Sequence, residues 1–286
     1  MTINNNTRAI SKNHPLGKPV FELRDVDYKY NGLTALKNIT FSVFPGESVA
    51  FLGANGSGKS TLLKLLDALY LPIHGNLNAF GIKIDGQFLN DETAVYNFRR
   101  KVGLVFQDPD VQLFSPTVWD EVAFAPLHLG LPRQEVILRC HRVLSFLGIE
   151  KLKDRPPHLL SGGEMKKVAL ASILSLDPDV WLFDEPTASL DPKSQSVLLD
   201  FISELAGRGK TVITATHDLA SIAEIADRVI VLSENHTLVA EGKPQEILTD
   251  DGLLVANNLI HEHHHRHGKT PHRHPHIHTL THHHSK

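Results

Sequence analysis

A glycine-rich segment, GANGSGKS at residues 53–60, constrains the fold of this chain more than any other part of its sequence. It follows a short apolar run, Ser48 to Leu52, and precedes TLLKLLDALY, whose apolar residues have helical spacing. The segment fits GxxxxGK[ST] in the strand–loop–helix context in which that pattern forms a phosphate-binding loop. A simple glycine turn is the alternative, and Lys59-Ser60 at this place argues against it.

Each residue type in this loop suits the binding of a nucleotide phosphate. Glycines let backbone N–H groups approach the phosphates at a helix N-terminus, the lysine reaches the β- and γ-oxygens, and the serine hydroxyl can ligate Mg²⁺. Thr61 is expected to bond the α-phosphate or to cap the helix. The predicted nucleotide-binding residues of the loop are Gly53, Asn55, Gly56, Ser57, Gly58, Lys59, Ser60 and Thr61.

An acidic pair, Asp184-Glu185, ends a second apolar run, Val180 to Phe183. A carboxylate at the C-terminal edge of a parallel sheet can hold Mg²⁺, so Asp184 is predicted to share a Mg²⁺ site with Ser60. Glu185 can leave the strand axis and is predicted to act as a general base or to orient the attacking water. An isolated pair of this kind would instead be two solvated acids at a strand end.

The hydrophobic patterns predict an α/β fold. Alternating apolar residues after Val20 predict an antiparallel β subdomain, and short apolar runs at 102–106, 180–183 and 212–215 predict buried parallel strands. A mostly helical pattern over about 108–176 predicts an inserted α-helical subdomain. Together with the phosphate-binding loop, these elements predict a P-loop NTPase core of the RecA-like type.

Outside residues 20–256 the composition changes. Residues 1–19 are polar with two prolines and are predicted to form a flexible N-terminal arm. Residues 257–286 are predicted to form a disordered, histidine-rich tail. We therefore expect one ATP-binding domain with an arm at one end and a tail at the other.

Composition and charge exclude several classes of protein. With 41% hydrophobic and 21% charged residues, the chain has the composition of a soluble globular protein. No apolar run approaches the roughly 20 residues of a membrane span, and MTINNNTRAISKNHP lacks the apolar core of a signal peptide. The formal net charge is -3 and no basic stripe is present, so no nucleic-acid partner is expected. The expected location is the cytosol.

Five further motifs follow the phosphate-binding loop along the chain. In order they are Gln107, LSGGE at 160–164, WLFDEP at 181–186, Ser189-Leu190-Asp191 and His217. With these motifs the chain resembles the ATP-binding subunits of ABC transporters over roughly Val20 to Leu248. The resemblance implies an ATPase that uses ATP and Mg²⁺ and packs head to tail as a homodimer or heterodimer. It also implies integral membrane coupling and substrate-binding subunits, at the cytoplasmic face of the cell membrane.

The same resemblance implies roles for individual residues. Ser161, Gly162 and Gly163 would grip the γ-phosphate of an ATP bound by the partner chain, and Asp191 would link the two sites. Gln107 would sense Mg²⁺ and the attacking water, and His217 would hydrogen-bond the γ-phosphate. Outside such an ordered set, a histidine after a strand is more often structural.

Four positions have competing interpretations. Tyr30, after the first predicted strand, resembles the aromatic residue that stacks on adenine, with Tyr28 as a rival and strand packing as the alternative for either. Lys166 and Lys167 begin the predicted helix after LSGGE and either are solvated or face the nucleotide; we expect both to be solvated.

The segment Phe106 to Pro132 bears on the transported substrate. It is similar to the corresponding region of energy-coupling-factor ATPases, which serve cobalt, nickel or vitamin uptake and use this region to meet a membrane coupling protein. Its apolar residues fit either that surface or the core of the helical subdomain; they are Val122, Phe124, Leu127 and Leu129.

The histidine-rich tail indicates a transition metal. From residue 261 onward lie 12 of the 19 histidines. Imidazole has a pKa of about 6.5 and can donate nitrogen to Ni²⁺, Co²⁺, Zn²⁺ or Cu²⁺ near neutral pH. A purification tag or a solvated tail without a metal role are the alternatives. The predicted ligands, in several shifting sets, are His261, His263, His264, His265, His267, His272, His274, His276 and His278.

These features together predict an ATPase subunit that energises import of nickel or cobalt, with Ni²⁺ or Co²⁺ also bound by the tail. A vitamin importer with the same machinery and a metal storage or delivery protein regulated by nucleotide are the alternatives. A soluble ABC ATPase of translation or DNA repair would have two linked nucleotide-binding halves or a long coiled-coil insertion, and the sequence has neither.

Overall fold

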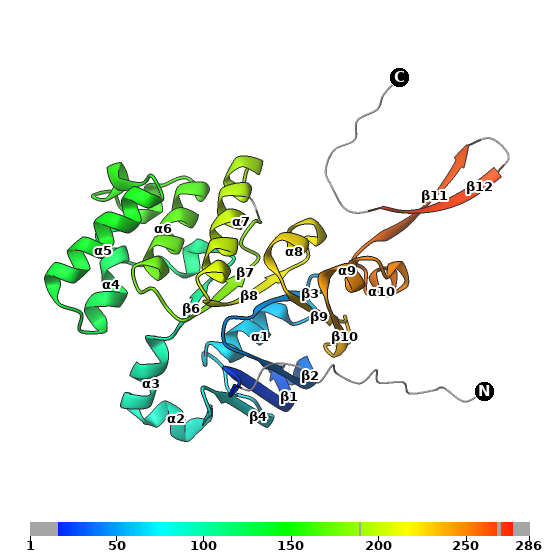
Figure 1. Cartoon of the computed structure of the whole chain (residues 1–286), viewed down its shortest axis with the longest axis horizontal. Helices are drawn as coiled ribbons and strands as arrows, with labels where there is room; N and C mark the ends of the chain where they lie inside the picture. Colours follow the sequence, from blue (N-terminus) through cyan, green and yellow to red (C-terminus); the bar gives the residue numbers. More distant parts are fainter. Residues whose placement is uncertain (1–16, 189, 268–269, 277–286) are drawn as a thin grey trace.

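The centre of the molecule is a six-stranded sheet (Figure 1) in a computed structural model that describes residues 17–188, 190–267 and 270–276. Its strands are β3 (Ser48–Leu52), β6 (Val102–Val105), β7 (Val180–Asp184), β8 (Thr211–Thr216), β9 (Arg228–Leu232) and β10 (Leu238–Gly242). They lie in the order β10-β9-β3-β8-β7-β6, parallel except for β10. Every residue of β3, β7 and β8 is buried, because helices or a second sheet cover both faces. The predicted parallel strands are therefore confirmed.

A second sheet is antiparallel, and two of its strands come before the phosphate loop in the sequence and two after it. It contains β1 (Phe21–Tyr30), β2 (Leu33–Val43), β4 (His74–Ala79) and β5 (Ile82–Lys83), in the order β2-β1-β4-β5. Asn31 and Gly32 join the first two strands with φ of 46° and 88°, the positive values that a tight two-residue hairpin turn needs. The predicted antiparallel subdomain is confirmed.

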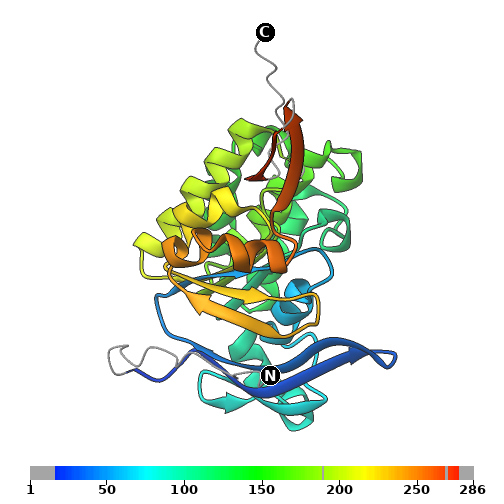
Figure 2. The same cartoon turned by 90° about the vertical axis from the view of Figure 1, so that its right-hand side faces the viewer.

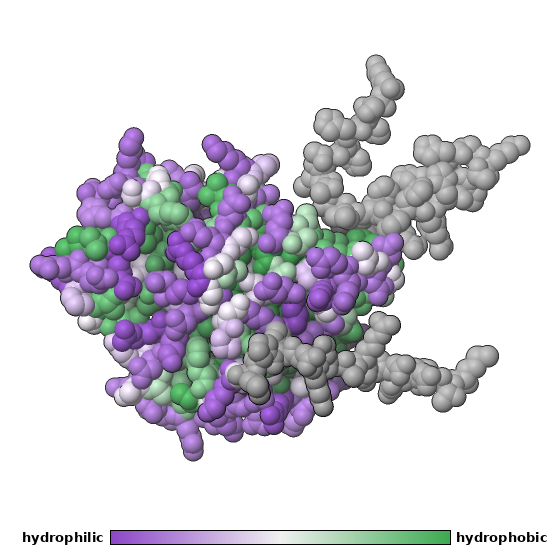
Figure 3. Space-filling model, viewed as in Figure 1, coloured by the Kyte–Doolittle hydropathy of each residue, from purple (hydrophilic) through white to green (hydrophobic). Residues whose placement is uncertain are grey.

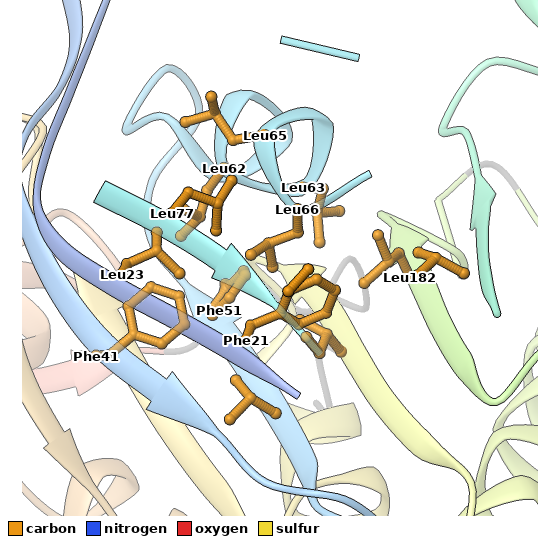
Figure 4. Packing of buried hydrophobic residues seen from close by; sticks show 14 of the residues in the cluster. Phe21, Leu23, Phe41, Phe51, Leu62, Leu63, Leu65, Leu66, Leu77 and Leu182 are labelled. Carbon is orange, nitrogen blue, oxygen red and sulfur yellow. The ribbon is translucent and has the colours of Figure 1, made fainter. Parts of the chain in front are cut away.

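The helix after the phosphate loop, α1 (Lys59–Leu66), lies between the two sheets. Figure 4 shows four of its leucines packed against Phe21 and Leu23 of β1, Leu77 of β4 and Phe51 of β3. All four leucines, Leu62, Leu63, Leu65 and Leu66, have 0% exposure. Burying one such side chain stabilises the fold by about 1.5–3 kcal/mol, so this core holds the helix and the loop before it in place.

Short helices and a helical subdomain lie between β5 and β7. Helices α2 (Gly86–Asn90) and α3 (Glu92–Arg99) precede β6, and the subdomain consists of α4 (Val118–His128), α5 (Arg133–Phe146) and α6 (Gly162–Leu174). Three 3-10 turns connect these elements, at Pro109–Val111, Glu150–Leu152 and Pro157–Leu159. The subdomain has its own core, in which Val122, Cys140 and Leu144 are buried. Thr117 caps α4, because its hydroxyl accepts a hydrogen bond from the Asp120 N–H.

The remaining helices cover the second face of the parallel sheet: α7 (Pro192–Gly207), α8 (Leu219–Ile225), α9 (Pro244–Leu248) and α10 (Asp251–Ala256). The view in Figure 2 shows the layers one above another, with the antiparallel sheet in blue below and the helices above. Helix α10 has no counterpart among the predicted elements. None of the helices in the described part of the chain has the length and hydropathy needed to cross a membrane.

The C-terminal segment differs from the disordered tail expected from residue 257. Leu259 and Ile260 are 6% and 4% exposed and pack with β3, β9 and α8. The backbone then forms an antiparallel hairpin of β11 (His261–His267) and β12 (Thr270–His276). Two isolated apolar residues show no periodicity that would predict their burial. They are buried because β3, β9 and α8, which are distant in sequence, pack around them. The predicted ligand His278 and arm residues 1–16 lie outside the described residues.

Candidate nucleotide-binding site

The phosphate loop connects β3 to α1, and its glycines are required by close backbone contacts. Gly58 has a φ of 107°, and a Cβ there would lie 2.4 Å from the Ala35 carbonyl oxygen of β2. A Cβ on Gly53 would lie 2.7 Å from the Leu232 carbonyl oxygen of β9. Asn55 and Gly56 form the exposed tip of the loop. The loop backbone is thus fixed against two strands, with its tip open to a ligand.

Lys59 lies inside the curve of this loop and is 6% exposed. Its Nζ donates hydrogen bonds to the carbonyl oxygens of Gly53 (2.8 Å) and Ala54 (3.2 Å). The same atom lies 3.3 Å from Oε1 of Glu185. A buried ammonium group at a helix N-terminus attracts an anion, and a phosphate fits this position.

Ser60 and Asp184 meet at the predicted Mg²⁺ site. Ser60 Oγ donates to Asp184 Oδ1 at 2.9 Å. Burial raises the pKa of Asp184, and the hydrogen bond from Ser60 opposes that rise. A hydroxyl and a carboxylate oxygen are the hard ligands that Mg²⁺ prefers, and a nearby cation favours the ionised carboxylate. The pair therefore fits Mg²⁺, which would neutralise charge that develops on phosphate oxygens.

Glu185 leaves the sheet as its role requires. Its φ is 46°, a positive value that costs a non-glycine residue about 1–3 kcal/mol and is held here by a hydrogen bond from its N–H to the Ala215 carbonyl oxygen (2.9 Å). The residue is 5% exposed. Its Oε1 lies 3.3 Å from Lys59 Nζ and 3.0 Å from His217 Nδ1, but neither contact has hydrogen-bond geometry. A buried acceptor without a donor fits a bound water.

His217 follows β8, the strand beside β7, and its side chain is 53% exposed. The sequence predicts a bond from His217 to the γ-phosphate, and the structure adds the approach to Glu185. Because β3, β7 and β8 are neighbours, their carboxyl ends bring Lys59, Glu185 and His217 together.

Gln107 follows β6, the strand on the other side of β7, and is exposed. The segment around it is tied to the helical subdomain by a residue that sequence reasoning missed. Gln112 accepts a hydrogen bond from Phe106 N–H (3.2 Å) and donates to the Ala169 carbonyl oxygen of α6 (2.8 Å). No sequence signal marked Gln112, because the partner that ties it to α6, Ala169, lies far along the chain.

Tyr30 lies beside the start of α1. Its hydroxyl is 3.2 Å from Thr61 Oγ1, and its ring meets those of Tyr28 and Tyr70 edge on. Burial raises the pKa of Tyr30 to about 12, so the hydroxyl stays neutral. Tyr28 stacks on Tyr70 and packs on the core, whereas Tyr30 is 38% exposed. The more exposed ring beside the loop supports Tyr30 as the candidate adenine contact.

Ser57 and Thr61 have surroundings that their predicted roles did not anticipate. Ser57 is 0% exposed and its hydroxyl has no hydrogen-bond partner in the described structure, while its N–H donates to the Ala54 carbonyl oxygen (3.2 Å). Thr61 is 7% exposed and its hydroxyl contacts Tyr30. It thereby links the candidate adenine contact to the phosphate loop.

Ser161, Gly162 and Gly163 form the exposed start of α6. Ser161 caps this helix, and the Glu164 carboxylate accepts its N–H (2.9 Å) and its hydroxyl (2.8 Å). The N–H bond is the main reason that the pKa of Glu164 is lowered. A Cβ on either glycine would meet no heavy atom within 4 Å. This helix N-terminus is thus open on the outside of the chain.

Asp191 caps α7 from an exposed position. Its Oδ1 accepts the Ser194 N–H (3.1 Å), and its Oδ2 accepts the Ser194 hydroxyl (2.6 Å). These bonds lower the pKa of Asp191, mainly through the hydroxyl. Asp191 is therefore an ionised group that fixes the path of the chain between Glu185 and α7.

Comparison with known proteins agrees with this geometry. The profile of the ABC transporter family matches residues 36–188. The chain belongs to the ABC transporter ATP-binding family. It is therefore an ATPase that uses ATP and Mg²⁺, and ABC ATPases work as dimers with membrane subunits.

Relatives within this family include transporters of known name. The nickel import ATP-binding protein NikO of Rhodobacter capsulatus is 47% identical over 85% of this chain and 96% of its own length. The energy-coupling factor transporter ATP-binding protein EcfA of Methanothermobacter thermautotrophicus is 44% identical, over 84% of this chain and 76% of its own. The solved structure of cbiO1 from Clostridium perfringens, part of the ABC transporter complex cbiONQ, superposes with a TM-score of 0.70 at 36% identity. It covers 85% of this chain and 96% of that one.

One expectation for this ABC ATPase is wrong. Lys166 is not simply solvated: it is partly buried, and its Nζ donates a hydrogen bond to the Ala188 carbonyl oxygen. Burial lowers its pKa, while the charges of Asp108 and Glu185 oppose that shift. Lys167, one position on, is exposed. The two lysines differ because α6 packs beside the turn after β7 and brings only Lys166 against it. The sequence alone does not distinguish two adjacent lysines.

Proposed function

We propose that this ABC ATPase energises the import of nickel or cobalt through separate membrane subunits. The observation that carries the proposal is the gathering of Lys59, Glu185 and His217 at one edge of the sheet, beside the Ser60–Asp184 pair. The nickel cargo is supported by the likeness to NikO and by the histidines of the tail.

Hydrolysis follows from the contacts of these residues. Lys59 and the loop N–H groups bind the phosphates, and Ser60 and Asp184 hold Mg²⁺. Glu185 accepts the proton of the attacking water. His217, whose Nδ1 lies 3.0 Å from Glu185 Oε1, is half exposed and therefore available to the γ-phosphate. Gln107, which follows the strand beside β7, positions the water and reports the state of the site to the helical subdomain through the neighbouring Gln112.

The dimer is proposed to be head to tail, as a homodimer or a heterodimer with a similar ATPase. Ser161, Gly162 and Gly163 then bind the γ-phosphate of the partner's ATP with an open helix N-terminus. Asp191, ionised and exposed, links the two sites. Two sites shared in this way make hydrolysis depend on closure of the dimer.

The surface for the membrane subunits is proposed to lie on the helical subdomain. A cavity of about 480 Å³ there is lined by Phe114, Phe124, Leu127 and His128, among others. Phe124 and Leu127 are 41% and 52% exposed, whereas Val122 is buried in the subdomain core. Figure 3 shows hydrophobic patches over this subdomain on an otherwise mostly hydrophilic face. Docking here would hold the ATPase at the cytoplasmic face of the membrane.

Two other functions compete with metal import. An importer of a vitamin would use the same ATPase site, and the likeness to an energy-coupling factor transporter ATP-binding protein is compatible with either cargo. A metal storage or delivery protein would bind metal on its tail and use nucleotide to regulate its conformation. The test uses cells that express the ATPase together with the membrane subunits that co-purify with it. Uptake of labelled Ni²⁺, Co²⁺ and vitamins by these cells distinguishes between the possible cargoes.

The Glu185→Gln variant tests the ATPase mechanism. Glutamine keeps the shape of the side chain but cannot accept the water proton, so we expect ATP binding to persist and kcat to fall by about 10²–10⁴. Steady-state ATPase assays and nucleotide-binding titrations measure both quantities. Undiminished turnover would refute the role of Glu185, and metal uptake that continues without ATPase activity would favour storage or delivery.

A further inference from the structure

The hairpin at the end of the chain arranges its histidines by register. In the backbone pairing of β11 with β12, His261 lies opposite His276, His263 opposite His274, and His265 opposite His272. Figure 1 shows the two strands side by side. In each of these three pairs, a histidine of β11 therefore lies opposite a histidine of β12.

All six of these histidines share one face of the hairpin. Alternate residues of a strand lie on the same face, and directly opposed residues of two strands also share a face. The other face carries Glu262 opposite Pro275, His264 opposite Arg273, and Arg266 opposite Pro271. These positions alternate with the histidine positions along each strand.

This register suits a metal ion better than composition alone would. Opposed residues have Cβ atoms about 4.5–5.5 Å apart, and diagonal neighbours about 7–8 Å apart, close enough for two imidazole groups to share one ion. Imidazole nitrogen suits Zn²⁺, Cu²⁺ and Ni²⁺. Two ligands held in place by strand pairing lose less freedom on binding than two on a free chain.

The hairpin is also attached to the ATPase rather than to a free chain end. Leu259 and Ile260, the two residues before β11, are buried in a cluster that includes Leu52, the last residue of β3 before the phosphate loop. The start of β11 is therefore held by the packed core of the domain.

We propose that the face of the hairpin with the three cross-strand histidine pairs is a binding site for a divalent transition-metal ion. The proposal deepens the proposed metal-binding role of the tail and rests on it, but it does not rest on the identity of the cargo. It replaces shifting sets of ligands with adjacent pairs fixed by strand register.

A permutation that keeps the composition tests the register. In the variant E262H/H263E/H265R/R266H, two histidines of β11 exchange places with their neighbours, and one cross-strand histidine pair is left, His261 with His276. The control E262R/R266E exchanges two residues of the other face and leaves all three pairs. Both variants keep the length, charge and histidine count of the full chain.

Titration of each purified protein with Ni²⁺ and Zn²⁺ against a chromophoric chelator at neutral pH gives the result. We expect the affinity of the tightest site to fall at least about tenfold in the permuted protein and to stay within about twofold in the control. Equal affinity in the wild type and both variants would show binding by composition alone and overturn the proposal. Their ATPase rates check the fold, and uptake assays test the cargo separately, because the titration needs no membrane subunit.

Discussion

At the scale of single residues, Lys166 extends the ATP site beyond its known motifs. The hydrogen bond from its Nζ to the Ala188 carbonyl oxygen joins α6, whose N-terminus is exposed, to the turn that follows Glu185. Asp108, after β6, also attracts its charge. Lys166 is therefore a positioning residue at the junction of three segments of the site.

The Lys166→Met variant should lower kcat by about tenfold or more and leave the KM for ATP nearly unchanged. A hydrogen bond to a charged group contributes about 1.5–3 kcal/mol, and its loss frees the turn after Glu185 without touching the phosphate loop. Steady-state kinetics measure the two constants. Lys166→Arg should restore much of the rate, whereas the exposed control Lys167→Met should match the wild type. Equal effects of the two methionine variants would contradict this role.

At the scale of elements, a contact between the buried carboxyl group of Asp67 and the partly exposed guanidinium of Arg99 joins α1 to α3. Asp67 ends α1, and Arg99 Nη1 donates to its Oδ2 (3.0 Å) and to its carbonyl oxygen (2.7 Å). Burial raises the pKa of Asp67 to about 7, although Arg99 opposes the shift. Stability should therefore depend on pH through this contact.

The sign of that dependence follows from the raised pKa. The folded protein holds a proton on Asp67 that the unfolded chain releases above pH 3.8, so this contribution to stability is present at low pH and is lost as pH rises toward 7. Asparagine is neutral at every pH. The stability of Asp67→Asn relative to wild type should thus increase between pH 5 and 8, by roughly 2–3 kcal/mol.

Thermal or urea unfolding at several pH values measures this difference. The control is Asp177→Asn, which removes the carboxylate of an exposed pair with Lys210 (3.0 Å). A difference between Asp67→Asn and wild type that is the same at pH 5 and pH 8 would show that the carboxyl group is ionised throughout this range.

At the scale of the whole molecule, the open N-terminus of α6 predicts assembly. The Gly162→Asp variant should bind ATP as a monomer but form no ATP-dependent dimer. An added side chain at Gly162 meets no atom of its own chain within 4 Å, so the fold is retained, while a carboxylate there repels the partner's γ-phosphate. Light scattering with and without ATP measures the dimer, in the Glu185→Gln background to slow hydrolysis.

The matched control is Gly86→Asp. Gly86 is likewise exposed at the start of a helix, α2, and a Cβ there also meets no atom within 4 Å. It should dimerise like its parent. ATP-dependent dimers of Gly162→Asp equal to those of the control would mean that the partner's ATP does not contact this helix.

The sequence by itself determined the residues of the nucleotide-binding site and the order of the core strands and helices along the chain. The loop of Gly53 to Ser60, the acidic pair and the apolar strands are local patterns, so strand, loop and helix could be predicted from neighbouring residues alone. Family resemblance assigned Gln107 and His217 to the ATP site of this chain and the signature glycines to the ATP of a partner chain. Each of these features is contained within a few residues of the chain.

The tertiary structure alone decided which distant groups meet. The 3.0 Å approach of His217 to Glu185, the bond from Lys166 to Ala188 and the burial of Leu259 and Ile260 depend on packing between segments far apart in sequence. The same is true of the tail, where composition predicted metal ligands and strand register paired six of them on one face. Local patterns fix elements, but contacts between elements depend on how their buried surfaces fit together.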